Sequence, residues 1–304
     1  GLALSSRNVR LNPREREKAP LIYRILTTAP SRREALRKLA EAGFRVEYLD
    51  QFEDRLLVAA HLGSVRLIDN VSLDQSLMVD SLRERPKILI TSGPTREPID
   101  RVRQLTNGSS GKTGAELAKV FVHLGYNVYF VHAQGSEQPN FQSENLKLFD
   151  YTDFESLNEC LKTHLKNESF FAIIHAAAVS DFSVDAIEGA ELRGGKLSSG
   201  ATTTLHLKPR FKILSLLQSY SKNPDLKVIG FKLTADADIN TIESALLKVN
   251  EEAHPLAIVH NDLREINSDS HKGQIFSHGQ LQANFNTKGE MAWEIYKILE
   301  GITL

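Results

Sequence analysis

The fold is decided by residues 87–120, which read KILITSGPTREPIDRVRQLTNGSSGKTGAELAKV. This stretch begins with an apolar run, continues through a long polar loop, and ends in an amphipathic helical pattern that follows a cluster of Gly and Ser. The apolar run indicates a buried strand, and the pattern after it indicates a crossover helix. We therefore expect the chain to continue in repeated strand and helix units.

Four later segments repeat the apolar character of this first strand. They occupy residues 127–135, 170–179, 226–233 and 255–263, and helical patterns separate them. Buried strands that alternate with helices predict an α/β fold, with a Rossmann-like, mainly parallel sheet and helices on both faces. Ligands bind such sheets beyond the carboxyl ends of the strands, so we expect the site in the loops that follow these strands.

The N-terminal part of the sequence has a different composition. Residues 1–85 contain 13 Arg and 2 Lys, whereas residues 86–304 contain 6 Arg and 16 Lys. Ser31 and Glu34 form a capping-box pattern that opens a helix ending at Gly43, and three strand-like segments follow. The sequence predicts a small α+β domain over residues 1–78, a linker over 79–86, and a Rossmann-type domain over 87–304.

The composition excludes several classes of protein. With 41% hydrophobic and 25% charged residues, the 304-residue chain is typical of globular proteins and not of disordered ones. Its net charge of -1 predicts no nucleic-acid partner, and no apolar segment is long enough to span a membrane. Cys160 is the only cysteine, which excludes an intrachain disulfide. We expect a cytoplasmic protein, with further chain upstream of Gly1.

The loop before the first predicted crossover helix is a candidate anion site. Three glycines, Gly108, Gly111 and Gly114, surround Ser109 and Ser110 just ahead of the helix. Free backbone N–H groups and the helix dipole meet at such a point, which predicts phosphate binding. The alternative is a Gly-rich turn with a serine cap.

Two common phosphate motifs do not fit this loop. A P-loop requires Gly five positions before the Gly of Gly111-Lys112-Thr113, where this sequence has Thr106. A dinucleotide fingerprint requires its glycines directly after the first strand, but here they follow some 15 residues later. A nicotinamide dehydrogenase is therefore disfavoured. The histidines show no metal-ligand spacing, so a resident metal stays unknown.

Two further segments carry candidate chemistry. HAAAVSDF, residues 175–182, places small side chains at the end of a strand, where a flat ring could approach the backbone, and supplies Asp181. RGGKLSSG, residues 193–200, is a glycine-rich basic loop that could bring Lys196 to developing negative charge. Tight core packing and an ordinary exposed turn are the respective alternatives.

Taken in order, five motifs resemble the phosphopantothenoylcysteine synthetase (phosphopantothenate-cysteine ligase) family of coenzyme A biosynthesis. They are SGPTREPIDRVRQLTNGSSGKTG, HAAAVSDF, GGKLSSG, GFKLTAD and VHNDL, within about residues 86–304. The resemblance implies an acid-amino acid ligase. A nucleoside triphosphate would activate 4′-phosphopantothenate as an acyl nucleotide, and the amine of cysteine would then form the amide.

The resemblance also implies roles for particular residues. Asn107 and Arg103 would hold the reacting carboxyl group, and Lys196 would turn over the acyl nucleotide. Substrate-binding positions would be Ser109, Gly111, Gly114, Phe231 and Asn261, and nucleotide-binding positions would be Ala176, Ala177, Asp181, Lys196, Phe231 and Lys232. Because Phe231 and Asn261 match positions that complete the site from a second subunit, a homodimer is implied.

The identity of the nucleotide stays open between CTP and ATP, with Mg²⁺. The sequence has Gly108 where an Arg is common in the family, Thr234 where a Glu is common, and KLSS where many bacterial members have KxKK. Bacterial members prefer CTP, whereas a KLSS-type flap resembles eukaryotic members that accept ATP. Two rival interpretations are a nucleotide-binding regulatory or degenerate module and an NAD(P)-type Rossmann enzyme.

The N-terminal segment resembles the C-terminal part of pantothenate synthetase. The resemblance rests on GLALSSRNVRL (1–11), AGFRVEYLD (42–50) and RLLVAAHLGSVRLIDN (55–70). Leu4, Ser5, Ser6 and Arg7 match that family's ATP-contacting loop, but the catalytic half is absent from this sequence. We expect the chain alone to make no pantothenate. No flavin and no NAD are expected either, because the synthetase segment stands where a flavin-dependent decarboxylase usually precedes the ligase.

Overall fold

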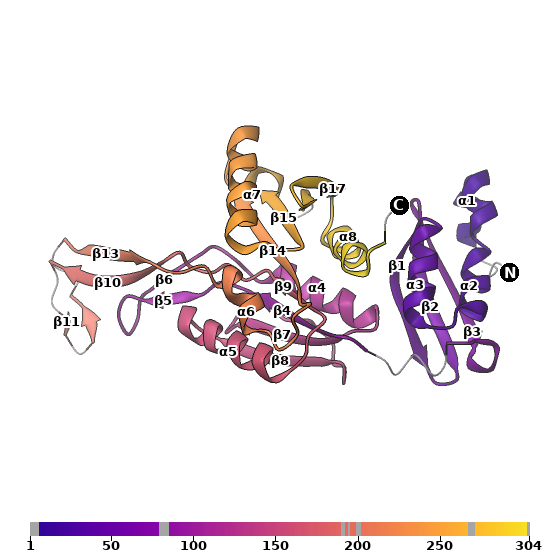
Figure 1. Ribbon diagram of the computed structural model, residues 1–304, viewed down its shortest axis with the longest axis horizontal. Coiled ribbons are helices and arrows are strands. Elements are labelled where there is room, and N and C mark those ends of the chain that lie inside the picture. The colour runs from indigo at the N-terminus through magenta and orange to yellow at the C-terminus, as the bar shows by residue number, and fades with distance from the viewer. Residues whose placement is uncertain are drawn as a thin grey trace.

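A computed structural model describes residues 6–78, 85–189, 192–193, 195–198, 202–266 and 271–302 (Figure 1). Its largest element is an eight-stranded sheet with the order β17-β16-β15-β14-β9-β4-β7-β8. The six strands from β15 to β8 are parallel, and β16 and β17 continue the sheet in antiparallel fashion. The strands are β4 (Lys87–Ser92), β7 (Asn127–Ala133), β8 (Leu146–Tyr151), β9 (Ala172–His175), β14 (Lys227–Thr234), β15 (Ala257–Asp262), β16 (Gly273–Ser277) and β17 (Gln280–Phe285).

Helices cover both faces of this sheet, which confirms the predicted Rossmann-like α/β fold. In β4, Ile88 and Ile90 face the core under α4 (Lys112–His123) and α8 (Lys288–Glu300). Leu89, between them, faces the opposite core under α5 (Phe154–Asn167) and α6 (Leu217–Tyr220). A strand buried on both faces explains the uninterrupted apolar run in its sequence. Between β14 and β15 lies α7 (Ile239–Ala253).

The N-terminal region forms a three-stranded antiparallel sheet with helices on one face, as the predicted α+β architecture requires. Its elements are η1 (Ser6–Arg10), α1 (Pro13–Lys18), α2 (Leu21–Thr28), α3 (Arg32–Glu41), β1 (Phe44–Phe52), β2 (Arg55–Leu62), β3 (Val65–Ser72) and η2 (Leu73–Gln75). Ser31 caps α3 by accepting a hydrogen bond from the backbone N–H of Glu34 at 3.1 Å. Gly43, with a φ of +90°, follows the helix end. Residues 79–84 of the expected linker lie outside the described residues.

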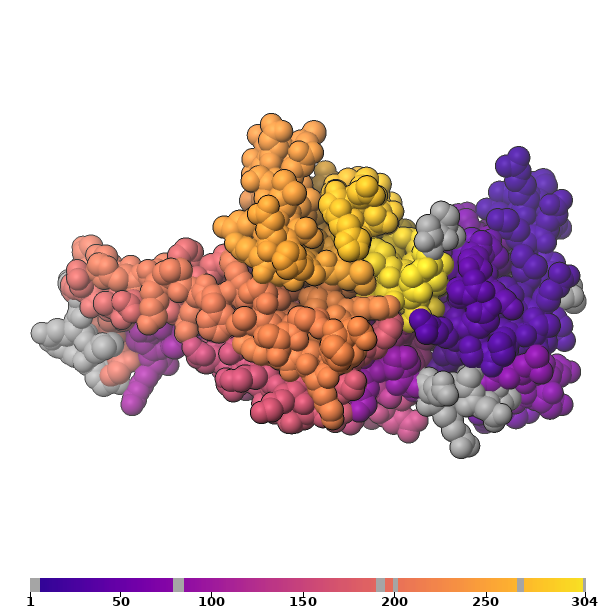
Figure 2. All heavy atoms as spheres, in the orientation of Figure 1, coloured from indigo at the N-terminus to yellow at the C-terminus, as the bar shows by residue number. Residues whose placement is uncertain are grey.

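The N-terminal region packs against α4 and α8 of the larger sheet. One continuous apolar core runs from α2, α3 and β1 into α4 and α8, and Figure 2 shows the two parts meeting in this view. Arg33 pairs with Glu300, which also accepts a hydrogen bond from the Tyr126 hydroxyl. Arg32, only 4% exposed, pairs with Asp50 at 3.2 Å. Burial lowers the pKa of Arg32 to about 10.

Three short hairpins project from the sheet as an arm (Figure 1). They pair β5 (Arg96–Pro98) with β6 (Gln104–Thr106), β10 (Phe182–Glu188) with β13 (Thr204–Pro209), and β11 (Leu192–Arg193) with β12 (Lys196–Leu197). Val102, Phe182 and Leu207 expose apolar surface on this arm. Two 3₁₀ turns complete the described elements, η4 (Ile213–Leu216) and η5 (Leu263–Glu265). None of the helices in the described ranges combines the length and apolarity that crossing a bilayer requires.

Candidate active site

A cavity of about 940 Å³ opens beyond the carboxyl ends of β4, β9, β14 and β15, where the fold predicts a ligand site. Its size lies within the range of small-molecule sites. The walls come from the loop 107–114, the loop 176–181, the segment 211–214, the end of β14 and the residues after β15. The cavity therefore brings together most of the positions that sequence analysis singled out.

The N-terminus of α4 forms one wall of this cavity. Its N-cap is Gly111, whose φ of +82° requires glycine and which offers no side-chain cap; the Ser110 Oγ accepts from the Lys112 backbone N–H only at 3.5 Å. A Cβ at Gly114 would lie 2.3 Å from the Ser92 Oγ, so glycine is also needed for α4 to approach β4 this closely. Ser109, Gly111 and Gly114 all line the cavity. Backbone amides at the start of a helix, here one of 12 residues, are groups that can bind an anion.

Asn107 joins the two loops that border the cavity. Its Nδ2 donates hydrogen bonds to the carbonyl oxygens of Ala178 and Val179, at 3.2 and 3.3 Å. Ala176 and Ala177, on the same side, also line the cavity. The side chain of Asn107 is thereby oriented at the rim between the glycine loop and the end of β9.

His175 is a cavity residue that the sequence analysis did not single out. The Thr91 Oγ1 accepts a hydrogen bond from the backbone N–H of Ala177 at 3.0 Å and lies 3.0 Å from the His175 Nδ1. This arrangement favours donation by the hydroxyl to Nδ1, which leaves the ring proton on Nε2. Complete burial lowers the pKa of His175 to about 4, so the ring is neutral at pH 7. Its position immediately before Ala176, at the end of a strand, was the available signal.

A cation that sequence reasoning missed stands beside Asp181. Lys212 forms an ion pair with Asp181, and both residues line the cavity together with Phe211. Both charged side chains stay half exposed, so an entering anion can compete for the lysine. The preceding segment, with Arg210 and Phe211 ahead of Lys212, offered a weak signal of basic and aromatic residues.

Phe231, Lys232 and Asn261 line the opposite side of the cavity. Asn261 is buried, and its Nδ2 donates to the carbonyl oxygen of Lys272 at 2.8 Å. All three therefore contribute to the cavity of their own chain.

Behind this wall, Thr234 occupies a buried polar position. Its hydroxyl donates to the Asp262 Oδ2 at 2.7 Å and lies 3.0 Å from the His260 Nε2. The Thr234 hydroxyl and neighbouring backbone N–H groups hold the pKa of Asp262 well below its usual range. Thr234 thus anchors the loop after β15 and does not line the cavity.

Arg103 and Lys196 lie on the arm and do not line the cavity. The Asp100 carboxylate accepts hydrogen bonds from the Arg103 Nη1 at 2.6 Å and from the backbone N–H of Leu197 at 3.0 Å. Lys196 is exposed on the adjacent β12. The structure therefore brings Arg103 and Lys196 near each other but not to Asn107.

The positions matching the pantothenate synthetase ATP loop lie apart from this cavity. Leu4 and Ser5 fall outside the described residues. Ser6 and Arg7 lie in η1 of the N-terminal region, and neither lines the cavity.

Comparison with known protein families gives two matches along the chain. Residues 83–302 match the family described as DNA/pantothenate metabolism flavoprotein C-terminal domain, and residues 1–72 match pantoate-beta-alanine ligase. The chain is 28% identical over 289 residues to the coenzyme A biosynthesis bifunctional protein CoaBC of Thermococcus kodakarensis, covering 92% of this chain and 67% of that protein. It is 51% identical over 73 residues to the pantothenate synthetase of Bdellovibrio bacteriovorus, covering 24% of this chain and 29% of that protein.

The fold agrees with a solved structure whose name matches this family description. The DNA/pantothenate metabolism flavoprotein of Streptococcus pneumoniae superimposes with a TM-score of 0.64 at 28% identity, over 72% of this chain and all of that chain. The family match covers more than half of the chain and includes every residue that lines the cavity. The chain therefore belongs to the DNA/pantothenate metabolism flavoprotein C-terminal domain family, with a pantoate-beta-alanine ligase-like segment at its N-terminus.

Proposed function

We propose that the chain is a phosphopantothenate-cysteine ligase of coenzyme A biosynthesis. The observation that carries the proposal is the uncapped N-terminus of α4, which opens into a large cavity beside Asn107. The family membership and the name of the Thermococcus relative support the same pathway. The substrates would be 4′-phosphopantothenate, cysteine and a nucleoside triphosphate that brings Mg²⁺ with it.

The reaction would take place in two steps. First, a carboxylate oxygen of 4′-phosphopantothenate attacks the α-phosphorus, and the bond to the departing pyrophosphate breaks. The cysteine nitrogen then attacks the acyl carbon, the bond to the nucleoside monophosphate breaks, and a proton passes from nitrogen to solvent. Joining anions in this way requires positioning and charge neutralisation more than a strong general base.

The cavity offers suitable groups for that task. We assign the substrate phosphate to Ser109, Gly111 and Gly114, at the α4 N-terminus. Asn107, whose Nδ2 donates to two carbonyl oxygens at 3.2 and 3.3 Å in the structure, would turn an N–H from them to hold the reacting carboxyl group. The nucleotide would lie along Ala176, Ala177, Asp181, Phe231 and Lys232, and Lys212 adds a cation beside Asp181.

The roles proposed for Arg103 and Lys196 require the arm to reach an active-site cavity, since neither residue lines the cavity of about 940 Å³ described above. A homodimer would provide such an arrangement by bringing the arm of one chain to the cavity of its partner. Relative to Arg103 and Lys196 on that arm, Phe231 and Asn261 would then belong to the second subunit. The exposed apolar side chains of Val102, Phe182 and Leu207 support burial of the arm against a second copy. Light scattering after size exclusion should give twice the mass of one chain.

Pyrophosphate release by the purified chain tests the function directly. The assay contains 4′-phosphopantothenate and Mg²⁺, compares CTP with ATP, and is run with and without cysteine. Sustained release that depends on cysteine is the expected result, and the faster nucleotide identifies the co-substrate as CTP or ATP. Nucleotide binding without release would instead assign a nucleotide-binding module.

The N-terminal region is proposed to have no synthetase activity of its own. The similarity to the Bdellovibrio enzyme covers 29% of that protein, and Ser6 and Arg7 line no part of the cavity. Incubation of the chain with pantoate, β-alanine and ATP should give no pantothenate above background. Measurable turnover would contradict this proposal.

A further inference from the structure

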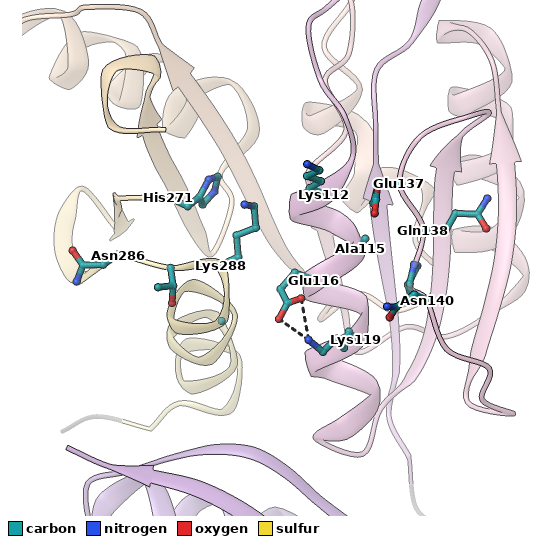
Figure 3. A pocket seen from close by; sticks show the side chains of 13 residues that line it. Lys112, Ala115, Glu116, Lys119, Glu137, Gln138, Asn140, His271, Asn286 and Lys288 are labelled. Atoms are coloured by element: carbon teal, nitrogen blue, oxygen red, sulfur yellow. Dashed lines mark hydrogen bonds and ion pairs between the residues drawn. The ribbon is translucent and has the colours of Figure 1, made fainter. Parts of the chain in front are cut away.

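A second cavity of about 480 Å³ lies between α4 and α8 (Figure 3). One side comes from a face of α4, the opposite side from the start of α8, and the third from residues 137–140 after β7. Lys112, His271 and Lys288 line both this cavity and the larger one. The second cavity therefore adjoins the proposed ligase site, and its other lining residues belong to it alone.

The α8 side of the cavity presents Lys288 and the start of the helix, while the Glu290 carboxylate is engaged by the Asn286 backbone N–H at 2.8 Å. The Thr287 Oγ1 accepts from the backbone N–H of Glu290 at 3.1 Å, which leaves the amides of Lys288 and Gly289 at the start of a 13-residue helix. Among the described residues, neither Lys288 nor Lys112 forms an ion pair. A helix N-terminus beside two unpaired ammonium groups favours an anion.

His271 provides an independent sign of a ligand. The residue is 7% exposed, and both its ring nitrogens lack a hydrogen-bond partner in the described part of the chain. Figure 3 shows the imidazole and the Lys288 side chain projecting from the α8 side into the gap that faces α4. A buried polar group without a partner costs free energy, which a bound ligand that hydrogen-bonds to it would recover.

The other walls define the rest of the ligand. Glu116 on α4 is neutralised by Lys119 at 3.2 Å. Glu137 stands on the β7 side with the amide side chains of Gln138 and Asn140. These groups suit hydroxyl or amide groups of a ligand, whereas the α8 side suits its anion.

We propose that this cavity is a second anion site, which binds a small phosphorylated molecule with its phosphate at Lys288, His271 and the α8 amides. The site goes beyond the proposed reaction, because it would exist whether or not the larger cavity performs ligation. Its phosphate could come from pyrophosphate leaving the adjacent cavity or from a free phosphate ester.

Gly289 permits a selective test, because it lines only the second cavity. A Cβ there would approach only the Arg45 Nη1, at 3.9 Å, so a side chain fits. Gly289→Asp places a negative charge in the cavity, and an acidic residue in the first turn of a helix is compatible with the helix dipole. Gly289→Asn is the matched control, because it has the same size without the charge. Thermal melts verify folding, and Asn140→Asp is a second charged variant at another wall.

Isothermal titration calorimetry of the full chain with inorganic pyrophosphate, without nucleotide, measures the site. We expect Gly289→Asp to weaken one binding event at least about tenfold and Gly289→Asn to retain it. Asn140→Asp should weaken the same event, because it also adds a negative charge to the cavity. Equal affinities in all proteins, or wild-type binding that only Ser109→Ala removes, would overturn the proposal.

Repeating the titration with glycerol 3-phosphate distinguishes the two sources of the phosphate. Binding of both ligands indicates a phosphate-ester site, and binding of pyrophosphate alone indicates a product site. The wild-type protein could also bind pyrophosphate at a single site. If Gly289→Asp abolishes that binding, the second anion site is supported and the phosphate role proposed for the glycine loop (107–114) is contradicted.

Discussion

The N-terminal region and the cavity end of the large sheet use polar groups in opposite ways. In the N-terminal region, Asn12 and Glu15 form a complete capping box and Ser31 caps α3. At the cavity end, α4 begins at Gly111 with no side-chain cap. Side chains thus accept from backbone amides at the starts of α1 and α3, whereas Gly111 at the start of α4 has no side chain to do so, and amides there can face a ligand. Substitutions in the first region should change stability, and those at the cavity should change turnover.

The largest expected effect tests the contact between the two parts. A Cβ at Gly125 would lie 2.2 Å from the Arg32 Nη1, and its φ of +92° already disfavours a side chain. Gly125→Ala should lower the free energy of unfolding by about 3 kcal/mol, because backbone strain adds to displacement of a buried arginine. Chemical denaturation followed by fluorescence measures the change.

Gly279→Ala is the matched control for this substitution. Gly279 has a φ of +75° but no atom within 4 Å of the added Cβ, so only the backbone strain remains. Equal losses in both variants would mean that the packing of Arg32 against Gly125 contributes nothing.

At the cavity, Asn107→Ala should lower turnover about 10²-fold while the unfolding transition stays in place. The substitution removes a donor that we assign to the reacting carboxyl group. Cysteine-dependent pyrophosphate release measures turnover, and denaturation of the same sample measures stability. Near-normal turnover would show that Asn107 only links the two loops and does not contact the reacting carboxyl group.

His175 should make stability depend on pH. Burial lowers its pKa from about 6.5 to about 4 in the folded protein, so the unfolded chain binds the proton more readily. The stabilisation is present above pH 6.5 and is lost as the pH falls toward 4; between pH 7.5 and pH 5 the loss is about 2 kcal/mol. His175→Gln should show a correspondingly flatter profile in denaturation experiments across this range. Parallel profiles would show that His175 titrates normally.

The smallest effect is expected on the arm. Lys196→Ala should slow consumption of the acyl nucleotide about tenfold and leave its formation nearly unchanged, since the lysine is proposed to act on the second step. Single-turnover experiments separate the two steps. Equal slowing of both would reassign Lys196 to nucleotide binding.

The sequence predicted the parallel strands β4, β7, β9, β14 and β15, because strands inside the sheet carry apolar runs. It missed the sixth parallel strand, the edge strand β8, whose side chains are mostly exposed or half-buried. It missed the antiparallel strands β16 and β17 and the extent of the arm, where short and half-exposed segments carry little pattern. The glycine loop was predictable because the start of a helix and the spacing of glycines can be recognised within a few consecutive residues. His175 and Lys212 were not, because their place in the cavity depends on contacts with distant segments, such as Thr91 and Asp181.

The continuous core between the N-terminal region and α8 has a consequence for synthesis on the ribosome. The apolar side of β1 and α3 emerges first, α4 follows, and α8 is made some 165 residues after α4 ends, from 123 to 288. At 5–20 residues per second, that surface waits roughly 10–30 s for its last partner. The nascent chain therefore carries an incomplete apolar patch for most of its translation, and chaperone occupancy should persist until α8 leaves the exit tunnel.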